Sequence, residues 1–237
     1  MALHFRPYPG VTVAAFIATA ILVGLGVWQL QRLQWKLALI AEVENHMTAP
    51  PLSLDDALKS PAGAMQYRRV ALEGHFDNAR EAYVFTTREG GEAVYHVLTP
   101  FIADGGRTLL VDRGYVPKDR LDPAARIPVE GPTRLVGVWR VPDAPGAFTP
   151  PPDVAHRIWY SRDLKGIAAA DRTQLAAPIV IEADAAPNPG GWPKGGQTVV
   201  SFRNEHLSYA VTWFGLAAGL LGVYFAYHMS KGRLRWA

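Results

Sequence analysis

The sequence predicts a membrane protein of the α + β class, in which two transmembrane helices flank a mainly antiparallel β domain (α+β) outside the membrane. Two observations lead to this fold class. Residues 7–31 and 206–230 contain no Asp, Glu, Lys or Arg. Each stretch holds a run of about 20 residues that is long enough to cross a hydrocarbon core. Between the two stretches, segments rich in β-branched and aromatic residues alternate with glycine-rich turns, the pattern of strands and hairpins.

The first transmembrane helix is expected at residues 11–30, after an N-terminal tail at 1–10. Apolar residues at helical spacing continue past the span, so the helix can extend beyond the membrane until Pro50 and Pro51 end it. An uncleaved anchor fits better than a cleaved signal peptide, because the apolar run is too long and no small-residue cleavage site follows it.

Residues 31–205 are expected to form one α+β domain. It should begin with a short helix at 52–59, capped by Ser53, and contain another helix within 164–175. Strands are predicted at 67–76, 81–89, 93–102, 108–117, 134–141, 157–162, 178–183 and 198–203.

The second transmembrane helix is predicted at residues 206–228, followed by a tail at 229–237. Gly215 and Gly219 form a small-xxx-small pair that permits close helix approach, and Ala20 and Gly24 offer a matching surface on the first span. We therefore expect the two spans to pack together through these residues.

Charge predicts the orientation. All 21 acidic residues lie in the middle segment, whereas each tail carries only basic residues. Basic residues beside spans favour the cytoplasmic side, so both tails should lie in the cytoplasm and the domain in the periplasm, although Arg32 and Lys36 directly follow the first span. The N-terminus lacks the Arg- and Ser-rich composition of a mitochondrial presequence, which favours a bacterial inner (plasma) membrane and a multi-pass protein. The basic residues of the tails are Arg6, Lys231, Arg233 and Arg235.

Several function classes find no support in the residues. The chain has no cysteine, which excludes disulfides, c-type haem attachment and thiolate metal sites. It contains no G-x-S-x-G, Walker or H-E-x-x-H motif, so we expect no enzyme. The basic residues do not cluster, so no nucleic acid is expected as a partner, whereas membrane lipid is.

The remaining concentration of chemistry lies at the start of the second span. His206 is predicted in the first helical turn, where the helix dipole favours the neutral, metal-binding imidazole. Tyr209 and Trp213 follow it on roughly one face, and Arg203 lies nearby. Two interpretations stay open. His206 could be an axial haem ligand with Arg203 pairing a haem propionate, or these residues could form an ordinary aromatic belt at the membrane interface.

Five ordered segments resemble blocks of the surfeit locus protein 1 (Shy) family. The similarity runs from about residue 24 to residue 227, and it departs mildly at Tyr115, where many members have Trp. The segments are LGVWQLQRLQWK (25–36), YRRVALEGHFD (67–77), YHVLTPF (95–101), LLVDRGYVP (109–117) and NEHLSYAVTWFGLA (204–217).

The resemblance implies an assembly factor for haem–copper cytochrome c oxidase that acts while haem A enters subunit I. It implies that His206 binds haem A transiently as a ligand of the haem iron, with the block around Trp28, Gln29, Arg32 and Trp35 beside it at the same membrane level. Subunit I and, as a further candidate, haem A synthase are the implied protein partners. The alternative is a scaffold that holds an unfinished oxidase subunit and never contacts haem.

Overall fold

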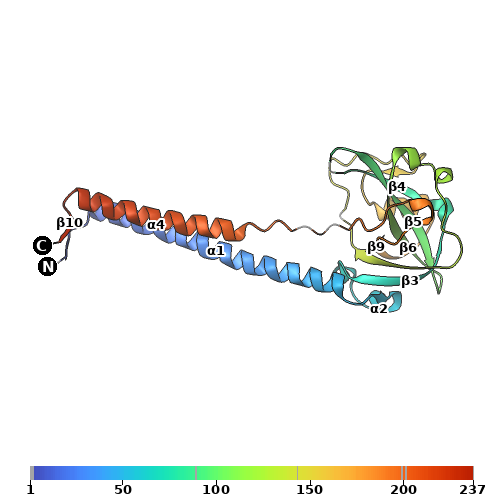
Figure 1. Ribbon diagram of the computed structural model, residues 1–237, viewed down its shortest axis with the longest axis horizontal. Coiled ribbons are helices and arrows are strands. Elements are labelled where there is room, and N and C mark those ends of the chain that lie inside the picture. The colour runs from blue at the N-terminus through green and yellow to red at the C-terminus, as the bar shows by residue number, and fades with distance from the viewer. Residues whose placement is uncertain (1–2, 89, 143, 199, 201, 237) are drawn as a thin grey trace. The chain divides into compact units, whose positions relative to one another are not determined.

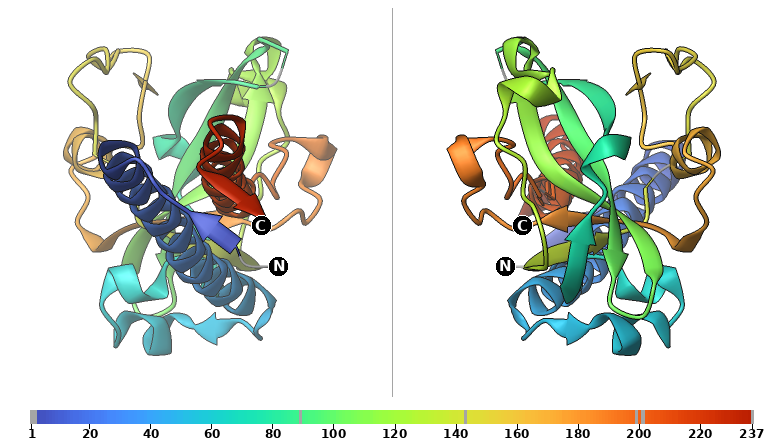
Figure 2. Two further views of the ribbon diagram at one scale, coloured as in Figure 1. Left: turned by 90° about the vertical axis from the view of Figure 1, so that its left-hand side faces the viewer. Right: turned by 90° about the vertical axis from the view of Figure 1, so that its right-hand side faces the viewer.

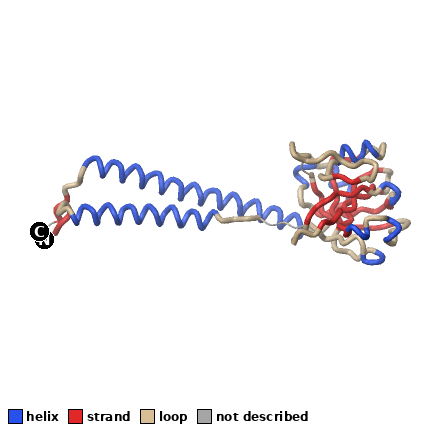
Figure 3. Tube along the Cα trace, turned by 90° about the horizontal axis from the view of Figure 1, so that it is seen from above, coloured by secondary structure: helices blue, strands red, loops and turns tan. Residues whose placement is uncertain are grey.

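The computed structural model describes residues 3–88, 90–142, 144–198, 200 and 202–236 (Figure 1). It divides into two compact units, which we call the helical unit and the sheet domain. The helical unit comprises residues 1–42 and 201–237, and the sheet domain comprises residues 43–200. Figure 3 shows most of the strands gathered in the sheet domain, and the long helices with one short strand pair in the other unit.

Two long helices make up most of the helical unit. Helix α1 spans Pro9–Thr48 and helix α4 spans His206–Ser230, and both are long and apolar enough to cross a membrane. At 40 residues, α1 is about 60 Å long, roughly twice the thickness of a hydrocarbon core. The predicted extension is therefore confirmed, and the helix ends just before Pro50 because a proline disfavours helical geometry in the residue preceding it.

The two helices lie side by side in Figures 1 and 3 and contact each other along a heptad-like row. On α4 this row consists of Ala210, Ala217, Tyr224 and His228, all buried. Thr12 Oγ1 lies 2.8 Å from the Tyr224 hydroxyl, and the Tyr8 N–H donates to His228 Nε2 at 3.2 Å. Spacings of seven and four residues keep one face of each helix toward the other.

The glycines of α4 do not form this contact, so the prediction made for them is wrong. A methyl group at Gly24, Gly215 or Gly219 would meet no atom within 4 Å. The contact instead uses Gly26, where a methyl group would lie 2.7 Å from the Phe214 ring. The aromatic side chain of one helix thus fills the space above a glycine of the other, which a small-xxx-small search does not detect.

Replacing Gly26 by alanine should therefore loosen the helix pair. The added methyl group would force the Phe214 ring to shift, and overpacking of this kind costs about 1–3 kcal/mol. We expect a lower thermal midpoint for the detergent-solubilised protein, restored in Gly26→Ala/Phe214→Ala. Gly24→Ala is the matched control, and equal destabilisation by both single variants would contradict the described packing.

The chain ends pair with each other. Strand β1 (Leu3–Phe5) and strand β10 (Leu234–Trp236) form an antiparallel pair, with His4 opposite Arg235. The sequence predicted only tails here, because segments of three residues carry too little pattern to be recognised as strands.

The sheet domain contains eight strands in the order β2-β3-β7-β9-β6-β5-β4-β8. Its helices are α2 (Leu54–Leu58), which Ser53 caps as predicted by accepting from the Asp56 N–H, and α3 (Leu164–Ala170). The strands are β2 (Leu52–Ser53), β3 (Arg69–Phe76), β4 (Ala82–Thr87), β5 (Ala93–Ala103), β6 (Arg107–Pro117), β7 (Thr133–Arg140), β8 (Ile158–Trp159) and β9 (Leu175–Ala183).

An additional pairing between β3 and β5 closes five of these strands into a ring, and the strong curl of the sheet is visible in Figure 2. Gly74 makes the closure possible, since a side chain there would collide with the backbone carbonyl of Ile102. Most pairs are antiparallel as predicted, but β2–β3, β4–β8 and β6–β9 are parallel.

One predicted strand is absent. Residues 198, 200, 202 and 203 form no strand, and residues 199 and 201 lie outside the described part of the chain. The closed ring explains this result, because β9 already pairs on both sides, with β6 and with β7. Residues 198–203 therefore cannot pair with β9, the strand that precedes them, despite their local propensity.

The core lies on both faces of the sheet. Leu109 and Val111 of β6 pack into one buried cluster with Trp139, whereas Leu110 points to the opposite face and packs with Trp159. Alternate residues of one strand thus enter different clusters, as the two-residue period of a strand requires. This accounts for the continuous apolar character of the segment at 109–111.

Candidate functional site

The most distinctive polar contact of the helical unit joins the beginning of α4 to the middle of α1. His206 is the first residue of α4, and its Nδ1 lies 2.8 Å from Oε1 of Gln29. Gln29 is only 9% exposed although its neighbours in sequence face outward. A buried amide in an apolar helix needs a hydrogen-bond partner, and the imidazole supplies one.

This contact defines which nitrogen of His206 carries the proton. An amide oxygen only accepts, so Nδ1 must donate, and the neutral ring then has its lone pair on Nε2. A neutral histidine whose second nitrogen is held by a hydrogen bond is the usual form of a metal ligand. The helix pair therefore presents an oriented nitrogen that is suited to bind a metal.

Three residues after Gln29, an aromatic and cationic cluster occupies α1. The Arg32 guanidinium lies between two indoles, with its central carbon 5.9 Å from the Trp28 ring centroid and 5.0 Å from that of Trp35. Trp28 is 49% exposed. Among the described residues no carboxylate pairs with Arg32, whose exposed guanidinium makes cation–π contacts with the two rings.

The described structure gives no polar contact between His206 and the other predicted site residues, Arg203, Tyr209 and Trp213. Arg203 is exposed, and it donates to Glu205 at 2.8 Å, a bond that lowers the pKa of the Glu205 carboxyl. Tyr209 is 51% exposed and does not belong to the row that faces α1. Trp213 is half-buried and lies seven residues after His206, which places it on the same side of the helix.

The resemblance placed Gln29 in the block beside His206 but gave it no binding role, although a signal for one exists. Buried and half-buried positions of α1 recur with alternating spacings of three and four residues from Thr12 onward, and Gln29 falls on this row. A polar residue on the packed face of an apolar helix marks a specific interhelical hydrogen bond. The full row is Thr12, Ala15, Thr19, Leu22, Gly26, Gln29, Leu33 and Lys36.

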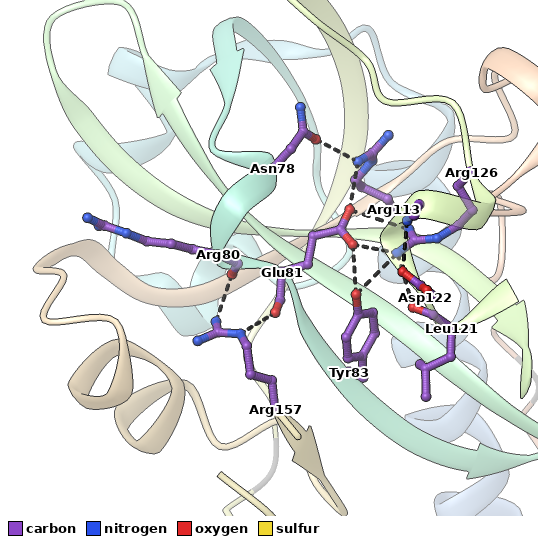
Figure 4. A network of polar contacts seen from close by, with 10 residues as sticks. Asn78, Arg80, Glu81, Tyr83, Arg113, Leu121, Asp122, Arg126 and Arg157 are labelled. Carbon is purple, nitrogen blue, oxygen red and sulfur yellow. Dashed lines mark hydrogen bonds and ion pairs between the residues drawn. The ribbon is translucent and has the colours of Figure 1, made fainter. Parts of the chain in front are cut away.

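A second polar centre lies buried in the sheet domain, around Glu81 (Figure 4). Its carboxylate receives Arg126 Nη2 at 2.6 Å, Arg113 Nη1 at 3.3 Å and the Tyr83 hydroxyl at 3.0 Å. Asn78 accepts a further bond from Arg113 at 3.1 Å. Burial raises the pKa of the Tyr83 phenol, and the Glu81 charge adds to this. Burial lowers the pKa of Arg113, opposed by Glu81.

A third centre surrounds Asp112 on β6. Its carboxylate accepts from His96 Nδ1 and Arg162 Nη2, each at 2.8 Å, and from the Gly114 N–H at 2.9 Å. Burial alone would raise the pKa of Asp112, but the bonds and charges of His96 and Arg162 together hold it below its usual value. These contacts give Asp112 a structural role, in which it pairs with Arg162 and holds the backbone at Gly114.

Asp112 should therefore make the sheet domain acid-sensitive. Because its folded-state pKa is lowered, its stabilisation is complete above its ordinary pKa of about 3.9 and is lost as the pH falls through the lowered value. Urea midpoints of the wild type should fall more steeply below about pH 4 than those of Asp112→Asn. The exposed Asp119→Asn should keep the wild-type pH profile, whereas parallel profiles for wild type and Asp112→Asn would contradict this role.

No group of three metal-ligating side chains occurs within the described ranges. Three histidines of the sheet domain bond locally instead: His46 to the Gln66 carbonyl, His96 to Asp112 and His156 to Asp153. The described residues thus offer no site in which three protein side chains hold a metal.

Comparison with known proteins places these features in a family context. A family model described as the SURF1 family matches residues 16–218, a range that contains both the Trp28–Trp35 cluster and His206. Surfeit locus protein 1 of Takifugu rubripes is 39% identical over 228 residues, covering 88% of this chain and 92% of the relative. The protein of that name from Homo sapiens is 38% identical, covering 85% and 72%. The SURF1-like protein of Drosophila melanogaster is 35% identical, covering 82% and 70%.

Proposed function

Because this chain belongs to the SURF1 family, as its five sequence blocks predicted, we propose that it is a membrane-anchored assembly factor for haem–copper cytochrome c oxidase. In this proposal it binds haem A transiently and assists its insertion into subunit I. The single observation that carries the haem role is the hydrogen bond between His206 and Gln29, which leaves Nε2 of the ring as a free, oriented ligand.

The residues around His206 suit such a group. A haem has an apolar ring and anionic propionates, and the helical unit offers exposed indoles together with a guanidinium that has no described carboxylate partner. Arg32 is thus a better candidate for pairing a propionate than Arg203, which Glu205 already engages. His206 Nε2 would hold the iron, and the haem itself would supply the redox centre of the finished oxidase.

Weak binding is essential to this role. A single axial histidine at the edge of a helix pair holds iron less firmly than an enclosed site with two ligands, so the oxidase's own histidines can displace it. The helical unit then acts as a temporary holder that presents the haem, and subunit I and haem A synthase are the partners that receive and deliver it.

The proposed location follows from the two apolar helices and the charge of the chain ends. Both helices would cross a bacterial inner membrane, with the basic termini in the cytoplasm and the sheet domain in the periplasm. His206 begins α4 at the end that the chain reaches directly from the sheet domain, so it would lie near the outer face.

Pigment content tests the haem role. The full chain, purified in detergent from cells that make haem A, should carry haem A, and His206→Ala should lose most of it. His4→Ala is the matched control, since His4 is also in the helical unit but lies in β1. Equal haem in the wild type and His206→Ala would refute the ligand role, as would a wild type that carries none.

The alternative scaffold function is favoured by a different observation. A methyl group added at Gly215, Gly219 or Gly222 of α4 would meet no described atom of another element within 4 Å, so another transmembrane helix can approach these glycines closely. Under this alternative, an oxidase subunit co-purifies with the chain, His206→Ala does not change its amount, and no haem is present in either protein. In neither case does the chain act as an enzyme.

A further inference from the structure

A cavity of about 550 Å³ opens in the sheet domain beside the buried Glu81 centre. Its walls come from β3, from β7 and from the loop that follows β9. Most of the lining is apolar, including Phe76, Leu135, Val136 and Pro187, and Arg113 reaches it from β6. The volume falls in the range of pockets that hold small organic molecules.

Arg113 is the unusual member of this lining. Its side chain is only 3% exposed, and its guanidinium carbon lies 4.6 Å from the centroid of the Phe76 ring. Nη1 donates to Asn78 and Glu81, but Nε is buried and has no partner among the described residues. An arginine presents five N–H donors in a rigid fork, so part of this fork is unused.

The charges around Arg113 do not balance. Glu81 is shared between Arg113 and Arg126, whose side chains are 3% and 4% exposed, so two buried cations face one buried anion. The remaining arginines of the cavity have their own partners in the described structure: Arg69 pairs with Asp184 at 2.7 Å and Arg134 with Glu73 at 3.4 Å. A buried net charge of one is costly unless an opposite charge is present.

We propose that this cavity binds a small organic carboxylate, with its anionic group on Arg113 and its apolar body against Phe76, Leu135 and Val136. The carboxylate matches the arginine fork and supplies the single negative charge that the buried centre lacks. The apolar walls select a ligand with a hydrocarbon or aromatic body over a bare inorganic anion. This inference is independent of haem binding, because it uses only residues of the sheet domain.

Fluorine NMR of the full chain in detergent can test the proposal, with 4-(4-fluorophenyl)butyrate as the probe. The uncharged amide of the same compound removes only the anionic group, and acetate, whose affinity is measured by its displacement of the fluorinated probe, removes the apolar body. Detergent micelles without protein measure partitioning of the probe. We expect saturable binding of the carboxylate, at least about tenfold tighter than that of the amide or acetate.

Two variants locate the binding. Arg113→Gln should weaken the carboxylate at least about tenfold, whereas Arg120→Gln, an exposed arginine outside the cavity, should bind like the wild type. Ala186→Trp adds a bulky side chain to the cavity lining without changing its charge and should abolish binding. If Arg113→Gln does not fold, the proposal is tested instead by comparing the affinities of the carboxylate and the amide for the wild type, and by the loss of binding in Ala186→Trp.

Three results would overturn the proposal. The first is no saturable binding above that of micelles alone, and the second is equal affinity for the carboxylate and the amide. The third is wild-type affinity in Ala186→Trp, which would place the probe elsewhere. None of these results depends on the haem content of the preparation, so failure here leaves the haem-binding role of His206 untouched.

Discussion

Glu81→Gln is expected to destabilise the sheet domain by about 3–5 kcal/mol, a large part of the stability of an ordinary domain. The carboxylate is buried and receives hydrogen bonds from Arg113, Arg126 and Tyr83 (Figure 4). The variant keeps the size of the side chain but removes its charge, so two buried guanidinium groups lose their common counter-charge. Urea unfolding followed by near-ultraviolet circular dichroism measures the loss, because Trp139 and Trp159 are 1% exposed in the core.

A matched control lies at the surface of the same domain. Glu73 pairs with Arg134 at 3.4 Å, with side chains 60% and 73% exposed, and Glu73→Gln should cost no more than about 1 kcal/mol. The difference between the two variants measures what burial adds to an ion pair. A loss below about 1 kcal/mol in Glu81→Gln would show that the centre is hydrated in solution.

Gln29→Leu should weaken haem A binding by about 10- to 100-fold, the usual effect of removing a group that orients a metal-bound histidine. Leucine fits the packed row of α1 but cannot accept from His206 Nδ1, so the ring is free to rotate and to exchange its tautomer. This expectation rests on the proposed function. Titration of haem A into detergent-purified protein, followed by its Soret absorption, gives the change in affinity.

A control and a second variant separate the effect of Gln29 on the orientation of the His206 ring from its effect on helix packing. Gln31→Leu makes the same chemical change at an exposed position two residues later and should leave the affinity unchanged. Gln29→Glu keeps an acceptor beside Nδ1 and should bind haem A at least as well as the wild type. Wild-type affinity in Gln29→Leu would exclude the orienting role, even if His206 binds the iron.

The fold was largely predictable where a pattern extends over many residues. The apolar runs and Pro50 predicted the long helix α1, and alternating apolar residues predicted strands such as β5 and β6. Closure of the sheet was not predictable, because it depends on a backbone approach at Gly74 between strands distant in sequence. Within this closed sheet β9 pairs on both sides, so residues 198–203 cannot add to that strand.

The candidate site was predictable only in part, for a similar reason. His206 stands out because it is polar at the start of an apolar helix, and its contact on α1 depends on how two helices pack. The glycine pattern suggested the wrong faces, since the packed row of α4 runs through Ala210, Ala217 and Tyr224. Once that row is known, Gln29 is the polar residue on the opposing face that lies opposite His206.

The measurement that tests the account most directly is chemical rescue of His206→Gly by imidazole. The variant removes the side chain and leaves space at the start of α4, which a free imidazole can occupy. The wild type, the variant and the variant with imidazole are each given haem A in detergent, and their Soret bands are compared. Direct ligation by His206 predicts a shifted, weakened band in the variant and its return with imidazole. A variant spectrum identical to that of the wild type, with no response to imidazole, would contradict it.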